Sequence, residues 1–157
     1  MKNELKQELT RRLCECNNGG LVLVMYDIYF GFSEDVKAAL PSNDRAALKK
    51  AVADVQAALD ELIGALDFKY PLAGQLYPLY SYCKRLFSTV LYSLDVSVVD
   101  EADSIMKKLR ISFETAAADD KSAPLMDNTQ KVYAGMTYGR GRLTESFIND
   151  DNRGFLA

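Results

Sequence analysis

LVLVMYDIYFGFSEDVKAAL, residues 21–40, is the stretch that decides the fold of this chain. Apart from Asp27 and Gly31, its first twelve residues are all apolar, and such a run exceeds the usual five or six residues of a β-strand. In a helix, Asp27, Gly31 and Glu34 would form one narrow polar strip, because they fall three or four residues apart. A helix that is apolar on its other sides must be buried. The stretch therefore predicts the central helix of a helical bundle.

Amphipathic patterns on both sides of this stretch predict neighbouring helices. Residues 2–16 place leucines on one stripe, and the Asn-Asn-Gly-Gly run at residues 17–20 is predicted to end that helix with a left-handed cap. Beyond the central helix, Ser42 is expected to cap a helix over residues 43–67. Its apolar residues alternate spacings of four and three, which is typical of left-handed helix packing: Leu48, Val52, Val55, Leu59, Leu62 and Leu66.

Two more helices are predicted before the tail. Residues 72–94 carry an apolar stripe, but Pro78 leaves the start of this helix open. A start near Leu72 puts Pro78 inside the helix, where it causes a kink, whereas a start at Tyr77 puts Pro78 in the first turn. Residues 97–100 resemble a capping box and open a last helix, which is expected to end near residues 119–120, before Pro124.

Residues 125–157 differ from the rest because they are rich in Gly and Asn and show no sustained period. Their spaced apolar side chains are too many for a typical solvated tail. We expect this tail to be partly ordered and to fold back over a partner-binding groove, so that a partner must displace it. The proposed tail anchors are Tyr133, Met136, Tyr138, Leu143 and Phe147. The sequence thus predicts an all-α antiparallel bundle of four or five helices over residues 1–124, followed by an irregular tail.

Composition argues against several functional classes. The net charge of −3 gives no electrostatic attraction to nucleic acid or anionic membranes, and no apolar run approaches the twenty or so residues of a membrane span. The absence of His removes the commonest general base and metal ligand. Cys14 and Cys16 would not face each other on a helix. We therefore expect no metal, no cofactor and no enzymatic activity, and the odd cysteine count fits a reducing cytoplasm.

Four short motifs occur in an order and spacing that resemble the flagellar secretion chaperone family FliS. The resemblance covers roughly residues 21–116 and departs from the family pattern at Ile28, where the family usually has Gly. The motifs are Met25-Tyr26-Asp27 for Leu-Tyr-Asp, Leu66-Asp67 for Leu-Asp, Leu76-Tyr77-Pro78-Leu79-Tyr80 for Leu-x-x-Leu-Tyr, and Leu109-Arg110 for Leu-Arg.

The resemblance implies a cytoplasmic antiparallel bundle that is not an enzyme. Members of the family bind the disordered C-terminal region of flagellin, which wraps around the bundle. This binding prevents premature polymerisation of flagellin and presents the subunit for export.

The central helix and the tyrosine-rich segment after residue 69 offer more apolar surface than five helices can easily bury. We predict that part of it forms a groove for a partner helix; the alternative is a fully buried core helix. The candidate partner-binding residues are Met25, Tyr29, Phe32, Leu62, Leu66, Leu76 and Tyr80. A chaperone is expected to be monomeric and one-to-one with its client. A structural or regulatory bundle that self-associates through the same face would instead form a symmetric dimer.

Overall fold

The structure is a computed structural model that describes residues 3–42 and 44–126. Most of these residues belong to five α-helices: α1 (Asn3–Glu15), α2 (Asn18–Ala39), α3 (Arg45–Gly64), α4 (Pro71–Ser93) and α5 (Val96–Ala118). A short 3-10 helix, η1 (Leu40–Ser42), follows α2. The described residues contain no strand, which confirms the predicted all-α class.

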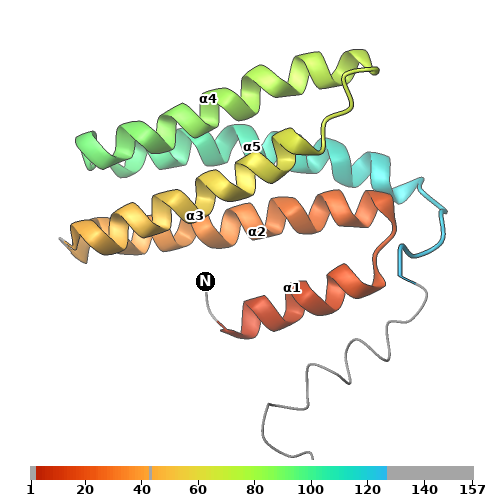
Figure 1. Cartoon of the computed structure of the whole chain (residues 1–157), viewed down its shortest axis with the longest axis horizontal. Helices are drawn as coiled ribbons and strands as arrows, with labels where there is room; N and C mark the ends of the chain where they lie inside the picture. Colours follow the sequence, from red (N-terminus) through yellow and green to blue (C-terminus); the bar gives the residue numbers. More distant parts are fainter. Residues whose placement is uncertain (1–2, 43, 127–157) are drawn as a thin grey trace, which may run out of the picture. The chain divides into compact units, whose positions relative to one another are not determined.

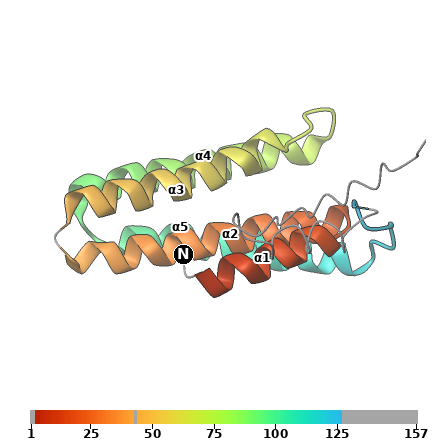
Figure 2. The same ribbon diagram turned by 60° about the horizontal axis from the view of Figure 1, so that its bottom comes forward.

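Consecutive helices run in opposite directions, as the ribbon in Figure 1 shows. Helices α2 to α5 form a closed four-helix bundle, because α2 packs on α3, α3 on α4, α4 on α5 and α5 back on α2. In Figure 2, α3 and α4 form one layer and α2 and α5 form the other. Helix α1 packs along α2 as a fifth helix. The antiparallel four- or five-helix bundle is therefore confirmed.

The core confirms the predicted role of α2 as the central helix. This helix contacts α1, α3 and α5, and its Tyr26, Tyr29 and Val36 are completely buried. The predicted seam of α3 also faces the core, where five of its six members are buried: Leu48, Val52, Val55, Leu59 and Leu62. Leu66, the sixth, is only partly buried.

The helix α2 begins earlier than predicted, because residues 17–20 start it instead of capping the helix before. Asn17 has extended backbone angles, φ −87° and ψ −173°, and its side-chain oxygen accepts a hydrogen bond from the Gly20 N–H. This is an N-cap, which satisfies one of the free N–H groups of the first turn. Gly19 and Gly20 therefore belong to α2, and the predicted left-handed cap of the first helix is wrong.

The first turn of α2 is also joined to the end of α5. The Gly19 N–H donates to Asp120 Oδ2 at 3.0 Å, and the Leu125 N–H donates to the Cys16 carbonyl at 2.9 Å. A Cβ atom added to Gly19 would lie only 3.0 Å from the Ala117 Cβ. Glycine at position 19 thus permits a close approach of α2 and α5.

Helices α3 and α5 begin with aspartate caps instead of the predicted serines. Asp44 accepts hydrogen bonds from two N–H groups in the first turn of α3, and Asp95 accepts one from Ser97 N in α5. Ser42 lies in η1, and Ser97 is already inside α5. The predictions that Ser42 and Ser97 cap these helices are therefore wrong by two residues each.

The observed start of helix α4 decides between the two predictions for Pro78. The helix starts at Pro71, which occupies its first position, and continues through Pro78 to Ser93. Pro78 is therefore an interior proline that cannot donate a hydrogen bond to the carbonyl four residues earlier.

The proposed tail anchors Tyr133, Met136, Tyr138, Leu143 and Phe147 lie outside the described residues. Their shielding role and the predicted boundary at residue 124 stay predictions.

Candidate functional site

An apolar pocket lies where α3 ends and α4 begins, and we call it the end pocket. Its volume is about 280 Å³, near the lower end of the range for small-molecule sites, so it suits a few side chains. Asp67 is its one charged lining residue. The lining consists of Val22, Met25, Leu62, Ala65, Leu66, Asp67, Tyr70, Leu72, Ala73, Leu76, Tyr80 and Phe113.

Helical spacing explains how this pocket is assembled. Val22 and Met25 are three residues apart on α2, so they share one face. Leu72, Leu76 and Tyr80 are four residues apart on α4 and form a stripe along its first turns. Leu62 of α3, the connection between α3 and α4, and Phe113 of α5 complete the lining. All four helices of the bundle therefore contribute.

The end pocket has a buried floor and an exposed rim. Leu62, Leu76 and Tyr80 are 3%, 6% and 2% exposed, whereas Tyr70 and Leu72 are 67% and 53% exposed. The floor is fixed by packing in the core, while the rim offers apolar surface to solvent. Such a rim around an apolar pocket is typical of a surface that binds another protein.

The structure brings together five of the seven predicted partner-binding residues. Those that line the end pocket are Met25, Leu62, Leu66, Leu76 and Tyr80. Their role in partner binding stays a prediction. Sequence reasoning missed the rim residues Tyr70 and Leu72 as binding candidates, although Leu72 belongs to the same apolar stripe as Leu76.

Tyr29 lies elsewhere, in the bundle core. Its hydroxyl donates to Asp103 Oδ1 at 3.1 Å, and Ser33 Oγ donates to the same oxygen at 2.7 Å. Lys37 Nζ lies 2.8 Å from the other oxygen of Asp103. Burial, together with the charge of Asp103, raises the pKa of Tyr29. Tyr29 therefore helps to satisfy a buried carboxylate, and it does not line the end pocket. Phe32, also predicted to bind a partner, is partly buried against the core and does not line the end pocket.

Tyr26 lies behind the floor of the end pocket and supports Tyr80. Their hydroxyl oxygens are 2.6 Å apart and form a buried hydrogen bond. Burial raises the pKa of both groups, so both stay neutral at physiological pH. The two rings also make a tilted contact at 6.5 Å between centroids. This pair fixes the distance between α2 and α4 beside the pocket.

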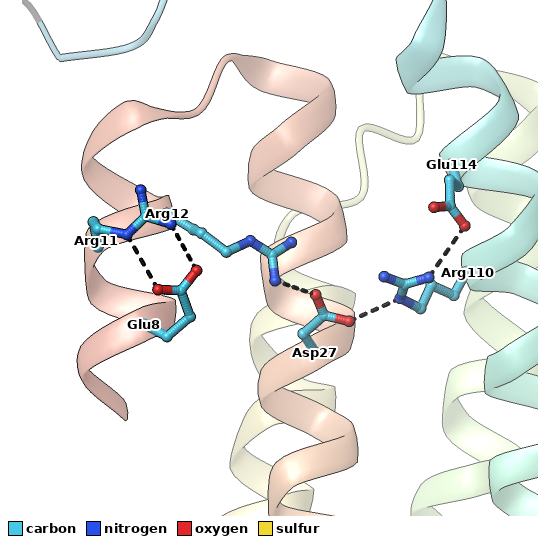
Figure 3. A network of polar contacts seen from close by, with 6 residues as sticks. All are labelled: Glu8, Arg11, Arg12, Asp27, Arg110 and Glu114. Carbon is cyan, nitrogen blue, oxygen red and sulfur yellow. Dashed lines mark hydrogen bonds and ion pairs between the residues drawn. The ribbon is translucent and has the colours of Figure 1, made fainter. Parts of the chain in front are cut away.

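Asp27 connects three helices through two arginines, as Figure 3 shows. Arg12 Nη1 of α1 donates to Asp27 Oδ2 at 2.7 Å, and Arg110 Nε of α5 donates to Asp27 Oδ1 at 2.8 Å. The hydrogen bond to Asp27 is the main cause of the raised pKa of Arg110. Asp27 is 18% exposed at its side chain, where such ion pairs gain more than at a fully solvated surface. The polar strip of α2 thus holds α1 and α5 in place.

A second apolar depression, which we call the side pocket, lies between α2 and α3. Its volume is about 570 Å³. Glu61 is its one charged lining residue, and the others are Leu21, Met25, Ile28, Ala58, Gly64 and Ala65. Among these, sequence reasoning selected only Met25. The other α2 residues could have been selected from their spacing, because Leu21, Met25 and Ile28 share one face of a helix.

Within the described residues, no group of three or more His, Cys, Asp or Glu side chains could hold a metal ion. Among the same residues, no helix combines the length and apolarity needed to cross a lipid bilayer.

Comparison with protein families gives a match over most of the chain. A model of the family described as "Flagellar protein FliS" matches residues 1–120. The matched range includes all five helices and every residue that lines the end pocket and the side pocket. Comparison with curated proteins gave no match.

Proposed function

The chain belongs to the FliS family of flagellar proteins, and we propose that it is a cytoplasmic export chaperone for flagellin. In this role it binds the C-terminal segment of flagellin, prevents premature polymerisation and delivers the subunit for flagellar secretion. The family is one of chaperones that bind flagellar proteins, and it is not a family of enzymes.

The observation that carries this proposal is the end pocket with its exposed apolar rim. Apolar side chains of an amphipathic helix dock into grooves of this kind, with anchors three or four residues apart. The buried floor of the pocket is rigid, because Leu62, Leu76 and Tyr80 are packed in the core. A preformed site reduces the entropy lost on binding. The pocket thus supports the binding of an apolar peptide segment.

Calorimetric titration with a peptide from the C-terminal region of the same organism's flagellin tests this function. We expect one-to-one binding in the micromolar range or tighter, with a negative heat-capacity change, because apolar surface is buried. Leu72→Asp places a charge on the rim and should weaken binding at least tenfold. Ile111→Asp is the matched control, since Ile111 is 62% exposed on α5 and lines neither pocket. Absence of binding by the unmodified protein would contradict the proposal.

A second candidate function uses the same surface for self-association. The exposed Tyr70 and Leu72 could bury each other in a symmetric dimer. Light scattering separates the two functions, because a chaperone is expected to be monomeric alone and one-to-one with its client. A dimer that Leu72→Asp converts to a monomer, with no binding of the flagellin peptide, would favour self-association.

A further inference from the structure

The end pocket and the side pocket are neighbours that share two lining residues, Met25 and Ala65. Met25 comes from α2 and is partly buried, and Ala65 follows the last residue of α3. The two side chains therefore form the divide between the pockets. Met is unbranched and has three rotatable bonds, so its side chain adapts to different neighbours. The boundary between the two pockets can therefore change shape when the Met25 side chain changes its rotamer.

The side pocket exists because α3 presents small residues towards α2. Its lining includes Ala58 and Gly64 of α3, and Ala65 directly after that helix. A Cβ atom added to Gly64 would meet no other atom within 4 Å, so the space above Gly64 is open. Leu21 and Ile28 are seven residues apart on α2, which corresponds to about 10 Å along a helix. Val22 and Met25, the α2 residues of the end pocket, lie within this span. The two pockets therefore lie side by side along α2.

The charges in the two pockets have the same sign. Glu61 lines the side pocket and Asp67 lines the end pocket, and no Lys or Arg lines either one. Within the described part of the chain, neither carboxylate forms an ion pair. An apolar groove with only acidic charges favours a ligand that carries a basic residue beside its apolar anchors.

We propose that the two pockets form one bipartite groove for a single peptide segment. The segment places apolar side chains on both sides of Met25 and a Lys or Arg next to Glu61. This inference rests on the proposed function and specifies the chemistry of the flagellin segment that binds. Gly64 and Glu61 then determine specificity, Gly64 by leaving room and Glu61 by its charge.

Substitution at Gly64 tests the bipartite groove with the same flagellin peptide. Gly64→Leu fills the side pocket without touching the end pocket, and we expect it to weaken binding at least tenfold. Gly64→Ala is the matched control, because it adds one methyl group and should change the affinity less than twofold. Circular dichroism and thermal unfolding of both variants establish that the fold is retained.

Substitution at Glu61 tests the charge. We expect Glu61→Gln to weaken binding several-fold at low ionic strength, with a smaller difference at high salt, because salt screens exposed charges. Glu4→Gln, an exposed acid on α1 outside both pockets, should leave the affinity unchanged.

The outcomes separate this inference from the proposed function. If the unmodified protein does not bind the flagellin peptide, both are overturned. If it binds, and Leu72→Asp abolishes binding while folded Gly64→Leu keeps full affinity, the single-groove proposal is wrong and the chaperone function stands. Unchanged affinity of Glu61→Gln at low salt overturns the basic-residue requirement.

Discussion

At the scale of residues, Tyr26 and Tyr80 show how two motifs distant in the chain act as one unit. They lie 54 positions apart, and their hydroxyl groups form a buried hydrogen bond. These two motifs therefore stabilise the fold through the contact between their tyrosines, in addition to any role in binding. A similar pairing joins Asp27, which belongs to the same motif as Tyr26, to Arg110 of the Leu-Arg motif.

A double-mutant cycle at Tyr26 and Tyr80 tests this pairing. Each single change to Phe leaves the other hydroxyl buried without its partner, and we expect a loss of about 1–3 kcal/mol in the free energy of unfolding. The double variant should lose less than the sum, because no unpaired hydroxyl remains. Urea denaturation measures all four proteins. Tyr92→Phe is the control, since Tyr92 is 86% exposed and should change stability by less than about 0.5 kcal/mol. Strictly additive losses would rule out the coupling.

At the scale of elements, apolar spacing predicted the helices well and their first residues poorly. The stripes of α3 and α4 alone sufficed to predict these helices, because burial of one face decides where a helix forms. The caps were missed because serine and aspartate are both good N-caps. The extra turn η1 after α2 moves the N-cap of α3 from the predicted Ser42 to Asp44.

The candidate site was predicted in part for a related reason. The sequence showed which faces of α2 are apolar but not where along α2 the bundle opens. Met25 lies at the open end, whereas Tyr29, one turn further on, is enclosed by the core. The difference in burial between Met25 and Tyr29 arises only when all four helices are packed together, so the sequence of α2 alone does not show it.

The interior proline of α4 gives a prediction at this scale. Pro78→Ala restores an N–H donor to the helix, and alanine is favoured over proline inside a helix by about 3 kcal/mol. We expect the free energy of unfolding to rise by about 1–3 kcal/mol, measured in urea. Pro71→Ala is the control and should have little effect, because Pro71 occupies the first helical position. A loss of stability in Pro78→Ala would show instead that packing requires the proline conformation.

At the scale of the whole molecule, the bundle closes through the junction of α2 and α5. Asp120 accepts the Gly19 N–H, and Asn17 Nδ2 donates to the Asp120 carbonyl at 3.0 Å. These bonds hold the start of the second helix against the end of the fifth. The prediction of one all-α bundle followed from the sequence. This closure did not, because nothing local in the sequence marks residues 101 and 103 positions apart as partners.

Gly19 is the residue with which to test the closure. Gly19→Ala puts a Cβ atom 3.0 Å from Ala117 Cβ and 3.1 Å from Asp120 Oδ2, so we expect a loss of about 1–3 kcal/mol in the free energy of unfolding. Hydrogen exchange should also accelerate in the last turn of α5. Gly74→Ala is the matched control, because its Cβ atom would meet nothing within 4 Å and should stabilise the helix by about 1 kcal/mol. Equal effects of the two changes would contradict a tight junction at Gly19.

The closure also sets an order of events during synthesis. Gly19 leaves the ribosome 101 positions before its partner Asp120, which at about 5–20 residues per second corresponds to roughly 5–20 seconds. During this interval α1 and α2 can pair with each other, but the junction has no second half. The last residues of the bundle to be translated therefore complete the contacts of its second helix. A nascent chain that stalls before residue 120 leaves the start of α2 without the contacts that it makes with Asp120 in the folded protein.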